Sequence, residues 1–255
     1  MSKYEPLWNY LKENKKESYK ITYEEIKNVL GFEIDHSFLS YKKELKDYGY
    51  EVGKISMKEK TVIFNKIEIE SEKRMKYIVL LREINISGKN KISMNELKAE
   101  LEKIGFENVS TYLNSGNAVF RSEIDNKEVI KENIQLLIKE KFNLEIPVYV
   151  TTAPELEDIL THTPEWWGTN NKEIYDNIIF IIPPTKYEDV YNTIGEPKEN
   201  LEKIQEYNNI IFWSYELKEY RKTNWWPKTA STSISDKITI RTANTMRKVL
   251  ELCNK

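Results

Sequence analysis

The chain has 255 residues, 40% of them hydrophobic and 31% charged, and its formal net charge is −2 at pH 7. This length suits two or three small domains, because single cores mostly hold roughly 100–150 residues. One cysteine and two histidines exclude a disulfide framework and give little support to a zinc site or a histidine-centred triad. No hydrophobic run approaches the roughly 18 residues that span a bilayer, and the N-terminus lacks a signal-peptide pattern. We therefore expect a cytoplasmic protein with no membrane association.

Residues 1–70 are predicted to form a small domain of three short helices followed by a β-hairpin. The helical segments are 5–14, 22–31 and 35–49, and the two strands are Tyr50–Met57 and Thr61–Lys66. This order is typical of a winged helix, in which the third helix and the hairpin contact DNA. Winged helices also serve as protein-interaction modules, and the lysines of these elements alternate with acidic residues. DNA contact and protein binding therefore remain alternatives.

The same segment resembles a widespread uncharacterised bacterial domain whose signature runs like PLWEYL, LTFEEIEEILG, GY.V and VTF. The matching stretches are Pro6–Leu11, Ile21–Gly31, Gly49–Val52 and Thr61–Phe64. The stretch Asp35–Ser40 departs from the tryptophan-rich helix of many members, so no role of that helix is transferred. A charged linker is predicted at residues 71–75.

Residues 76–152 show the βαββαβ order of a ferredoxin-like plait. The predicted elements are strand Tyr77–Asn85, helix Met94–Ile104, strands Val109–Leu113 and Asn117–Arg121, helix Asn126–Glu140 and strand Ile146–Thr151. Ser93 and Glu96 have the spacing of a capping box at the start of the first helix. Ser115-Gly116 supplies the positive φ that a tight hairpin needs.

Residues 153–255 are predicted to form a second α+β, plait-like subdomain. Helices are expected at Pro154–Leu160, Tyr187–Ile194 and Asn244–Leu252, and strands at Asn177–Ile182, Ile210–Tyr215 and Ile238–Ile240. Two tryptophan pairs, Trp166-Trp167 and Trp225-Trp226, are expected in loops. They are either core and interface residues or stacking surfaces for nucleic-acid bases.

Basic residues are concentrated near the C-terminus. Eight lysines and arginines lie between Lys218 and Lys248, against only two acidic residues. Such a stretch could meet phosphate groups, or it could balance the acidic middle of the same chain.

Two motifs place residues 75–255 close to a known family. The first starts with Leu80–Asn90 (LLREINISGKN) and continues through Met94, Gly105-Phe106 and Thr111–Asn117, and the second is Thr239–Thr245. They resemble a bacterial family of unknown function with the signature LLRGINVGGKN, TYLQSGN.VF and TTRNWNT. The resemblance implies two ferredoxin-like α+β subdomains and no established reaction. Glu83 and Ser87 depart from the family's glycines, and Glu83 would add negative charge to an anion site at this loop.

The polar residues of these motifs suggest an anion-binding cleft. Three lie at or just past a strand end before a helix N-terminus, where backbone N–H groups and the helix dipole favour an anion. Three more come from the hairpin strands and three from the start of the last helix. The nine candidates are Arg82, Asn85, Lys89, Tyr112, Ser115, Asn117, Arg241, Asn244 and Thr245. Alternatively, they are turn formers, helix caps and structural ion-pair residues.

The leading prediction is non-catalytic binding of a phosphate-bearing ligand, with nucleic acid as one candidate partner. An enzyme acting on a phosphorylated or carboxylated small molecule is a second possibility, with Glu83 or Tyr112 as the acid–base group. A homodimer or larger homo-oligomer formed through open sheet edges is a third. No P-loop, dinucleotide fingerprint, zinc spacing or calcium loop is present in the sequence, so no cofactor and no metal are predicted.

Overall fold

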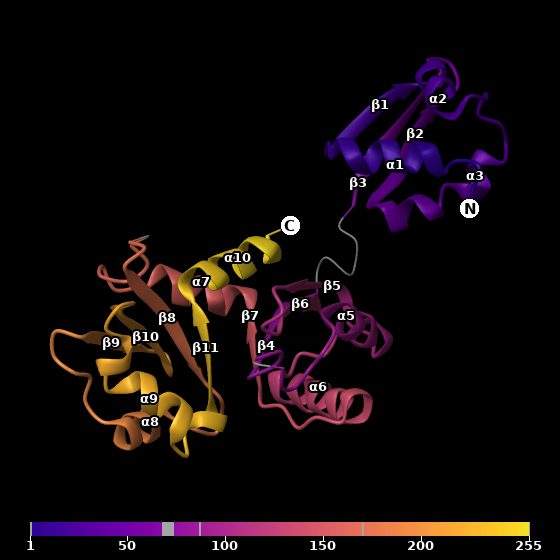
Figure 1. Cartoon of the computed structure of the whole chain (residues 1–255). Coiled ribbons are helices and arrows are strands. Elements are labelled where there is room, and N and C mark those ends of the chain that lie inside the picture. The colour runs from indigo at the N-terminus through magenta and orange to yellow at the C-terminus, as the bar shows by residue number, and fades with distance from the viewer. Residues whose placement is uncertain (1, 68–73, 87, 170, 255) are drawn as a thin grey trace. The chain divides into compact units, whose positions relative to one another are not determined.

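A computed structural model describes residues 2–67, 74–86, 88–169 and 171–254. The chain divides into two compact units, Met1–Arg74 and Met75–Lys255, and each is described by itself (Figure 1). Residues 71–73 of the predicted linker lie outside the described residues.

The first unit packs three short α-helices on a three-stranded antiparallel sheet. Its elements are α1 (Glu5–Asn14), β1 (Ser18–Thr22), α2 (Tyr23–Leu30), α3 (Phe38–Tyr41), a 3-10 turn η1 (Glu44–Tyr48), β2 (Tyr50–Ser56) and β3 (Thr61–Lys66). The strand order is β1-β3-β2. Trp8, Phe38 and Phe64 lie in its core.

Two features of this unit differ from the sequence prediction. Strand β1 was not predicted; it is five residues long, and Tyr19 and Ile21 alternate into the core. The predicted third helix is divided into α3 and η1. The winged-helix assignment of this unit stays a prediction.

The second unit begins with a ferredoxin-like plait, as predicted. Its elements are β4 (Lys76–Leu81), α5 (Met94–Lys103), β5 (Glu107–Tyr112), β6 (Asn117–Arg121), α6 (Lys127–Phe142) and β7 (Val148–Thr152). The sheet order β5-β6-β4-β7 follows from the βαββαβ order, with both helices packed on one face. Strand β4 ends four residues before the predicted end at Asn85, because Glu83 and Asn85 have positive φ.

The remainder repeats the same topology. Its elements are β8 (Ile174–Ile181), α8 (Tyr187–Ile194), β9 (Glu202–Tyr207), β10 (Ile210–Glu216), η2 (Tyr220–Lys222), α9 (Trp225–Ser231), η3 (Ser235–Lys237) and β11 (Ile238–Thr242). The sheet order β11-β8-β10-β9 is that of the first plait read from the opposite edge. Thus the second α+β subdomain is also a plait, and β9 and α9 are elements that the sequence pattern did not predict.

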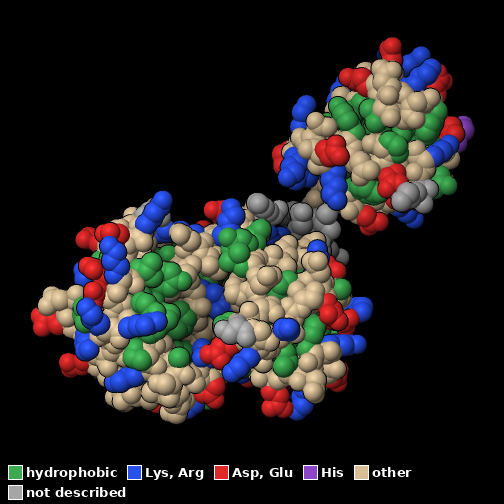
Figure 2. Space-filling view, viewed as in Figure 1, with side chains coloured by type: hydrophobic (Ala, Val, Ile, Leu, Met, Phe, Trp, Pro, Cys, Tyr) green, Lys and Arg blue, Asp and Glu red, His purple; other side chains and the backbone are tan. Residues whose placement is uncertain are grey.

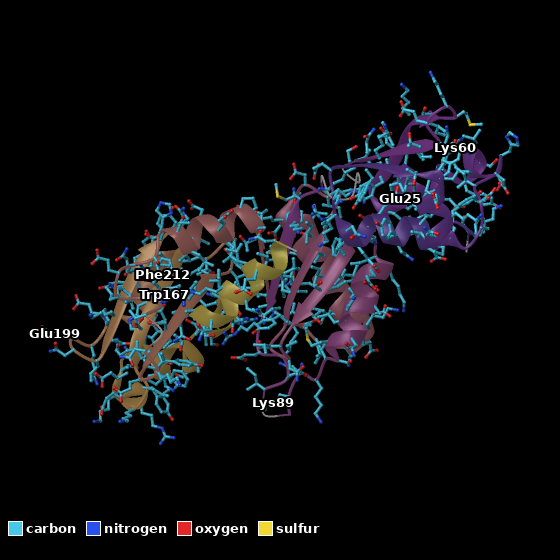
Figure 3. All side chains as sticks on the ribbon, turned by 90° about the horizontal axis from the view of Figure 1, so that it is seen from above. Glu25, Lys60, Lys89, Trp167, Glu199 and Phe212 are labelled. Atoms are coloured by element: carbon cyan, nitrogen blue, oxygen red, sulfur yellow. The ribbon has the colours of Figure 1, made fainter. Side chains whose placement is uncertain are left out.

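Each plait is followed by one further helix, α7 (Ala153–Thr161) or α10 (Ala243–Cys253). These two helices contact each other and pack in a core shared by inward-facing residues of both sheets (Figure 1). Trp167 and Phe212 belong to this core, with ring centroids 5.1 Å apart (Figure 3). The shared core therefore holds the two plaits in a fixed arrangement.

Candidate functional site

The polar centre of the second unit is the guanidinium group of Arg241, which is only 8% exposed. From β11 it reaches into the first plait, donating from Nε to Asn117 Oδ1 (2.6 Å) and from Nη2 to the carbonyls of Leu81 (2.7 Å) and Ser115 (2.9 Å). Its Nη1 donates to Thr239 Oγ1 and to the carbonyl of Ile240. All three guanidinium nitrogens are therefore committed to protein acceptors.

Arg82 makes a reciprocal contact from the first plait to the second. Its Nη1 donates to the carbonyl of Ile238 (2.7 Å), and its Nη2 donates to the carboxylate of Glu83. Burial lowers the pKa of Arg82, against the attraction of Glu83 and Asp236. Burial, together with the charge of Arg82, lowers the pKa of Arg241 to about 10, so both side chains stay charged at neutral pH.

The hairpin between β5 and β6 is shaped to accept Arg241. The side chain of Asn117 is fully buried and donates to the carbonyl of Tyr112 (2.8 Å) and to Ser115 Oγ (3.1 Å). Gly116 has φ +78°, and a Cβ there would lie 2.7 Å from Leu81 Cβ. The Tyr112 ring packs against the core shared with α10. This close approach of the hairpin to β4 lets one guanidinium bond to both.

The structure therefore brings Ser115, Asn117 and Arg241 together through hydrogen bonds, while Arg82 nearby bonds to Glu83 and to the carbonyl of Ile238. We name this set, with the carbonyls that it binds, the arginine network. At the start of α10, polar groups also bond to each other and not to a ligand: Thr242 Oγ1 accepts from the backbone N–H of Thr245 (3.2 Å). Asn244 is exposed, and its side chain has no hydrogen-bond partner among the described residues.

The loop after β4 has a different organisation. Asn85 fixes it to the hairpin turn, since its Nδ2 donates to the carbonyls of Ile92 and Asn114 and its Oδ1 accepts from the Ile92 N–H, each at 2.9 Å. Lys89 is exposed on this loop (Figure 3). Glu83 does not line the cavity described next, because its carboxylate is bonded to Arg82.

Beside this loop lies a cavity of about 570 Å³ at the start of α5, which we name the loop cavity. Ser93 caps the helix by accepting from the Glu96 N–H (3.4 Å), which is half of the predicted capping box. The N–H groups of Met94 and Asn95 have no hydrogen-bond partner in the described part of the chain. The lining residues include one cation and no acid: Asn85, Gly88, Lys91, Ile92, Ser93, Met94, Asn95 and Asn114.

Of these lining residues only Asn85 was a sequence candidate, and the polar side chains of Lys91, Ser93, Asn95 and Asn114 were not. The sequence offered a way to find them, since they lie directly beside the predicted loop and helix start. Lys91 has no ion-pair partner among the described residues.

A larger cavity of about 1080 Å³ lies between the plaits, with α6 on one side and α8 and η3 on the other. Its lining includes three lysines and four acids, Lys131, Lys139, Lys237, Glu132, Glu145, Asp189 and Asp236. Lys139 and Glu145 pair with each other at 2.8 Å. This balance gives the larger cavity no preference for an anion.

Over the described ranges, no group of three or more His, Cys, Asp or Glu side chains is placed to hold a metal ion. In the same ranges, no helix has the length and hydropathy needed to cross a membrane.

Comparison with known proteins agrees with this architecture. The family model described as "Protein of unknown function (DUF1697)" matches residues 75–212, and the chain belongs to that family. The solved structure of the conserved bacterial protein SP0830 from Streptococcus pneumoniae is similar, with 28% sequence identity and a TM-score of 0.62. The similarity covers 70% of this chain and 98% of that one. The comparison with curated proteins gave no match.

Proposed function

We propose that this DUF1697 member is a non-catalytic binding protein for a phosphate-bearing ligand, with the phosphate held in the loop cavity. One observation carries the proposal: the N–H groups of Met94 and Asn95 are unpartnered at a helix start that Lys91 also lines. Backbone donors and the positive end of the helix dipole favour an anion there, and a nearby ammonium group adds to that preference.

The other polar regions of this unit are less suitable for an anion. Every nitrogen of the Arg241 guanidinium already donates to the protein, so a ligand would have to displace buried hydrogen bonds. The larger cavity contains more acids than lysines. The loop cavity combines an uncompensated lysine with free backbone donors.

The size and chemistry of the loop cavity favour a phosphorylated organic molecule over phosphate alone. About 570 Å³ falls within the range of roughly 300–1,000 Å³ that is usual for small-molecule sites. The amide groups of Asn95 and Asn114 have no hydrogen-bond partner among the described residues, and each can both donate and accept. A nucleotide, or the terminal phosphate of a nucleic acid, would supply matching groups. Lys89, exposed on the same loop, could contact a further phosphate.

The test is calorimetric titration of the full chain with inorganic phosphate and nucleoside monophosphates, together with anisotropy of labelled DNA and RNA across a salt series. We expect binding that weakens as salt rises and that falls at least about tenfold in Lys91→Gln, because a charge-assisted hydrogen bond contributes roughly 1.5–3 kcal/mol. The control is Lys98→Gln, which removes an exposed lysine from α5 outside the cavity. Equal affinity in the wild type and in Lys91→Gln, or no binding of any phosphate compound, would refute the proposal.

A further inference from the structure

A cluster of aromatic side chains reaches the surface of the second plait, where β8 begins and β10 ends. Trp226 is 40% exposed, Tyr175 is 37% exposed and Leu217 is 48% exposed. Tyr175 is the register partner of Tyr215, so strand pairing places both on one face of the sheet. Leu217 follows β10 in the turn, where its N–H donates to the carbonyl of Glu173 (2.8 Å). With the half-buried Tyr220, we name Tyr175, Leu217, Tyr220 and Trp226 the aromatic platform.

The Trp226 ring is held firmly although it is exposed. Its centroid lies 4.9 Å from that of Tyr220, in an edge-on contact, and 5.8 Å from that of buried Tyr215. Its backbone N–H donates to Thr223 Oγ1. Over β8 and β10, hydrophobic side chains are visible at the surface with lysines and arginines beside them (Figure 2). A fixed, exposed ring can stack on a ligand with little loss of conformational entropy.

Two uncompensated cations lie beside this platform. Arg221 donates from Nε to the Tyr220 hydroxyl (2.8 Å), and its guanidinium lies 5.4 Å from the centre of that ring. The Nη groups of Arg221 have no hydrogen-bond partner among the described residues. Lys198 has no carboxylate partner among these residues either. Lys198 is adjacent because its Nζ donates to the carbonyl of Lys222 (2.7 Å).

The acids of this region do not neutralise these two cations. Glu173 pairs with Lys218 and Glu219 pairs with Lys222. The buried carboxylate of Glu202 accepts from the backbone N–H groups of Lys198 and Asn224. Glu216 directly follows Tyr215 in β10, so its side chain is on the opposite face of the sheet.

Elsewhere in the basic C-terminal stretch, three of the cations hold protein carbonyls. Arg241 is in the arginine network, Lys228 donates to the carbonyl of Ile194, and Arg247 donates to that of Gly168. Within this basic stretch, the segment 218–222 places charged side chains beside exposed aromatic rings.

We propose that the aromatic platform binds single-stranded nucleic acid, with bases stacked on Trp226 and Tyr175 and phosphates bound by Arg221 and Lys198. Exposed aromatic rings beside cations are the general means by which proteins hold unpaired bases. A carbohydrate fits less well, because the uncommitted groups are donors only, whereas sugar hydroxyls also need acceptors. A duplex fits less well too, because its bases are already stacked. This inference is independent of the loop cavity.

The probes are fluorescein-labelled twelve-nucleotide oligo(dT) and oligo(U), measured by anisotropy with the full chain, and a duplex of the same length. We expect both single strands to bind more tightly than the duplex. Trp226→Ala should weaken binding roughly 5- to 150-fold, since stacking on one aromatic ring contributes about 1–3 kcal/mol per base. Trp226→Phe should retain most of the affinity. Arg221→Ala should reduce the slope of log K against log salt by about 0.7.

Two control variants separate this site from other effects. Tyr10→Ala removes an exposed aromatic side chain from the first unit and should leave the affinity unchanged. Lys98→Gln removes an exposed lysine from α5, away from the platform, and should also leave the affinity unchanged. Circular dichroism of each variant checks folding. The proposal is overturned if neither single strand binds, if the duplex binds equally well, or if Trp226→Phe, Trp226→Ala and Arg221→Ala all bind like the wild type. A carbohydrate or protein partner would produce the first of these results.

Discussion

The arginine network and the loop cavity lie on either side of the same β5–β6 hairpin and β4 end, and they use their polar groups in opposite ways. Around Arg241, all three guanidinium nitrogens donate to protein acceptors and the site is closed. At the start of α5, two backbone donors and Lys91 remain available. The difference separates polar residues that join the two plaits from polar residues that are free to meet a ligand.

Arg241 is a buried cation to which no carboxylate bonds among the described residues, which is unusual for a buried charge. Its acceptors are mainly backbone carbonyls, among them Leu81 at the end of β4 and Ser115 in the hairpin. Docking of the two plaits therefore depends on one side chain that satisfies several buried acceptors at once. The predictions below test whether this region is structural and the loop cavity is not.

Replacing Arg241 with methionine should have the largest effect. The carbonyls of Leu81 and Ser115 and the amide of Asn117 would lose their donor while buried, which should destabilise the fold by about 3–5 kcal/mol. Urea unfolding followed by circular dichroism measures the change. Arg221→Met, at an exposed arginine, is the control and should change stability by less than about 0.5 kcal/mol. Similar midpoints for the two variants would contradict a structural role for Arg241.

Gly116→Ala should have the next largest effect on stability. Its positive φ and the 2.7 Å approach to Leu81 Cβ should together cost about 2–4 kcal/mol. Gly88→Ala is the matched control, because Gly88 also has positive φ but no atom within 4 Å of the added Cβ, and it should cost about 1–2 kcal/mol. Calorimetric unfolding compares the two. Equal losses would mean that the hairpin does not need to approach β4 so closely.

Ser93→Ala removes the cap of α5 at the edge of the loop cavity. Loss of the hydrogen bond to the Glu96 N–H should cost about 1 kcal/mol and speed hydrogen exchange in the first turn of the helix. Ser93→Thr keeps the hydroxyl and should restore most of that stability. If alanine and threonine behave alike, the hydroxyl does not stabilise this helix start.

Lys91→Gln should have the smallest effect on stability, within about 0.5 kcal/mol, because Lys91 is exposed and unpaired among the described residues. Its effect on phosphate affinity should be large for the reason given above. This combination, a stable fold with weakened binding, is the opposite of what Arg241→Met should show. Marked destabilisation by Lys91→Gln would place the loop cavity with the structural residues.

The fold could be predicted where helix periodicity, caps and apolar strands agreed. The predicted strand Asn117–Arg121 and the predicted helix Tyr187–Ile194 have the bounds of β6 and α8. Strand β9, with the sequence EKIQEY, was missed because its pairing with β10 determines its conformation more than its own residues do. Helix α9 was missed because Trp225, Trp226 and Pro227 are typical of a loop, although proline is tolerated in a first turn.

The convergence of Asn117 and Arg241 could be inferred from the family motifs, but their burial could not. Burial depends on how the two plaits dock, and nothing in the local pattern around Arg241 indicates that β4 and the hairpin supply carbonyls to it. Lys91 and Asn95 were missed because they lie just beyond the motif stretch Leu80–Asn90. The hydrogen bonds of Asn85 determine which side chains line the cavity, and these hydrogen bonds can be seen only in the three-dimensional structure.

The most direct test of the central claim is a titration of the isotopically labelled full chain with inorganic phosphate, followed by amide chemical shifts. We expect the amide signals of Met94 and Asn95 to shift first and to saturate, and the guanidinium Nε–H signal of Arg241 to stay unchanged. Shifts that begin at Arg241, or an absence of saturating shifts at the start of α5, would contradict the assignment of the loop cavity as the anion site.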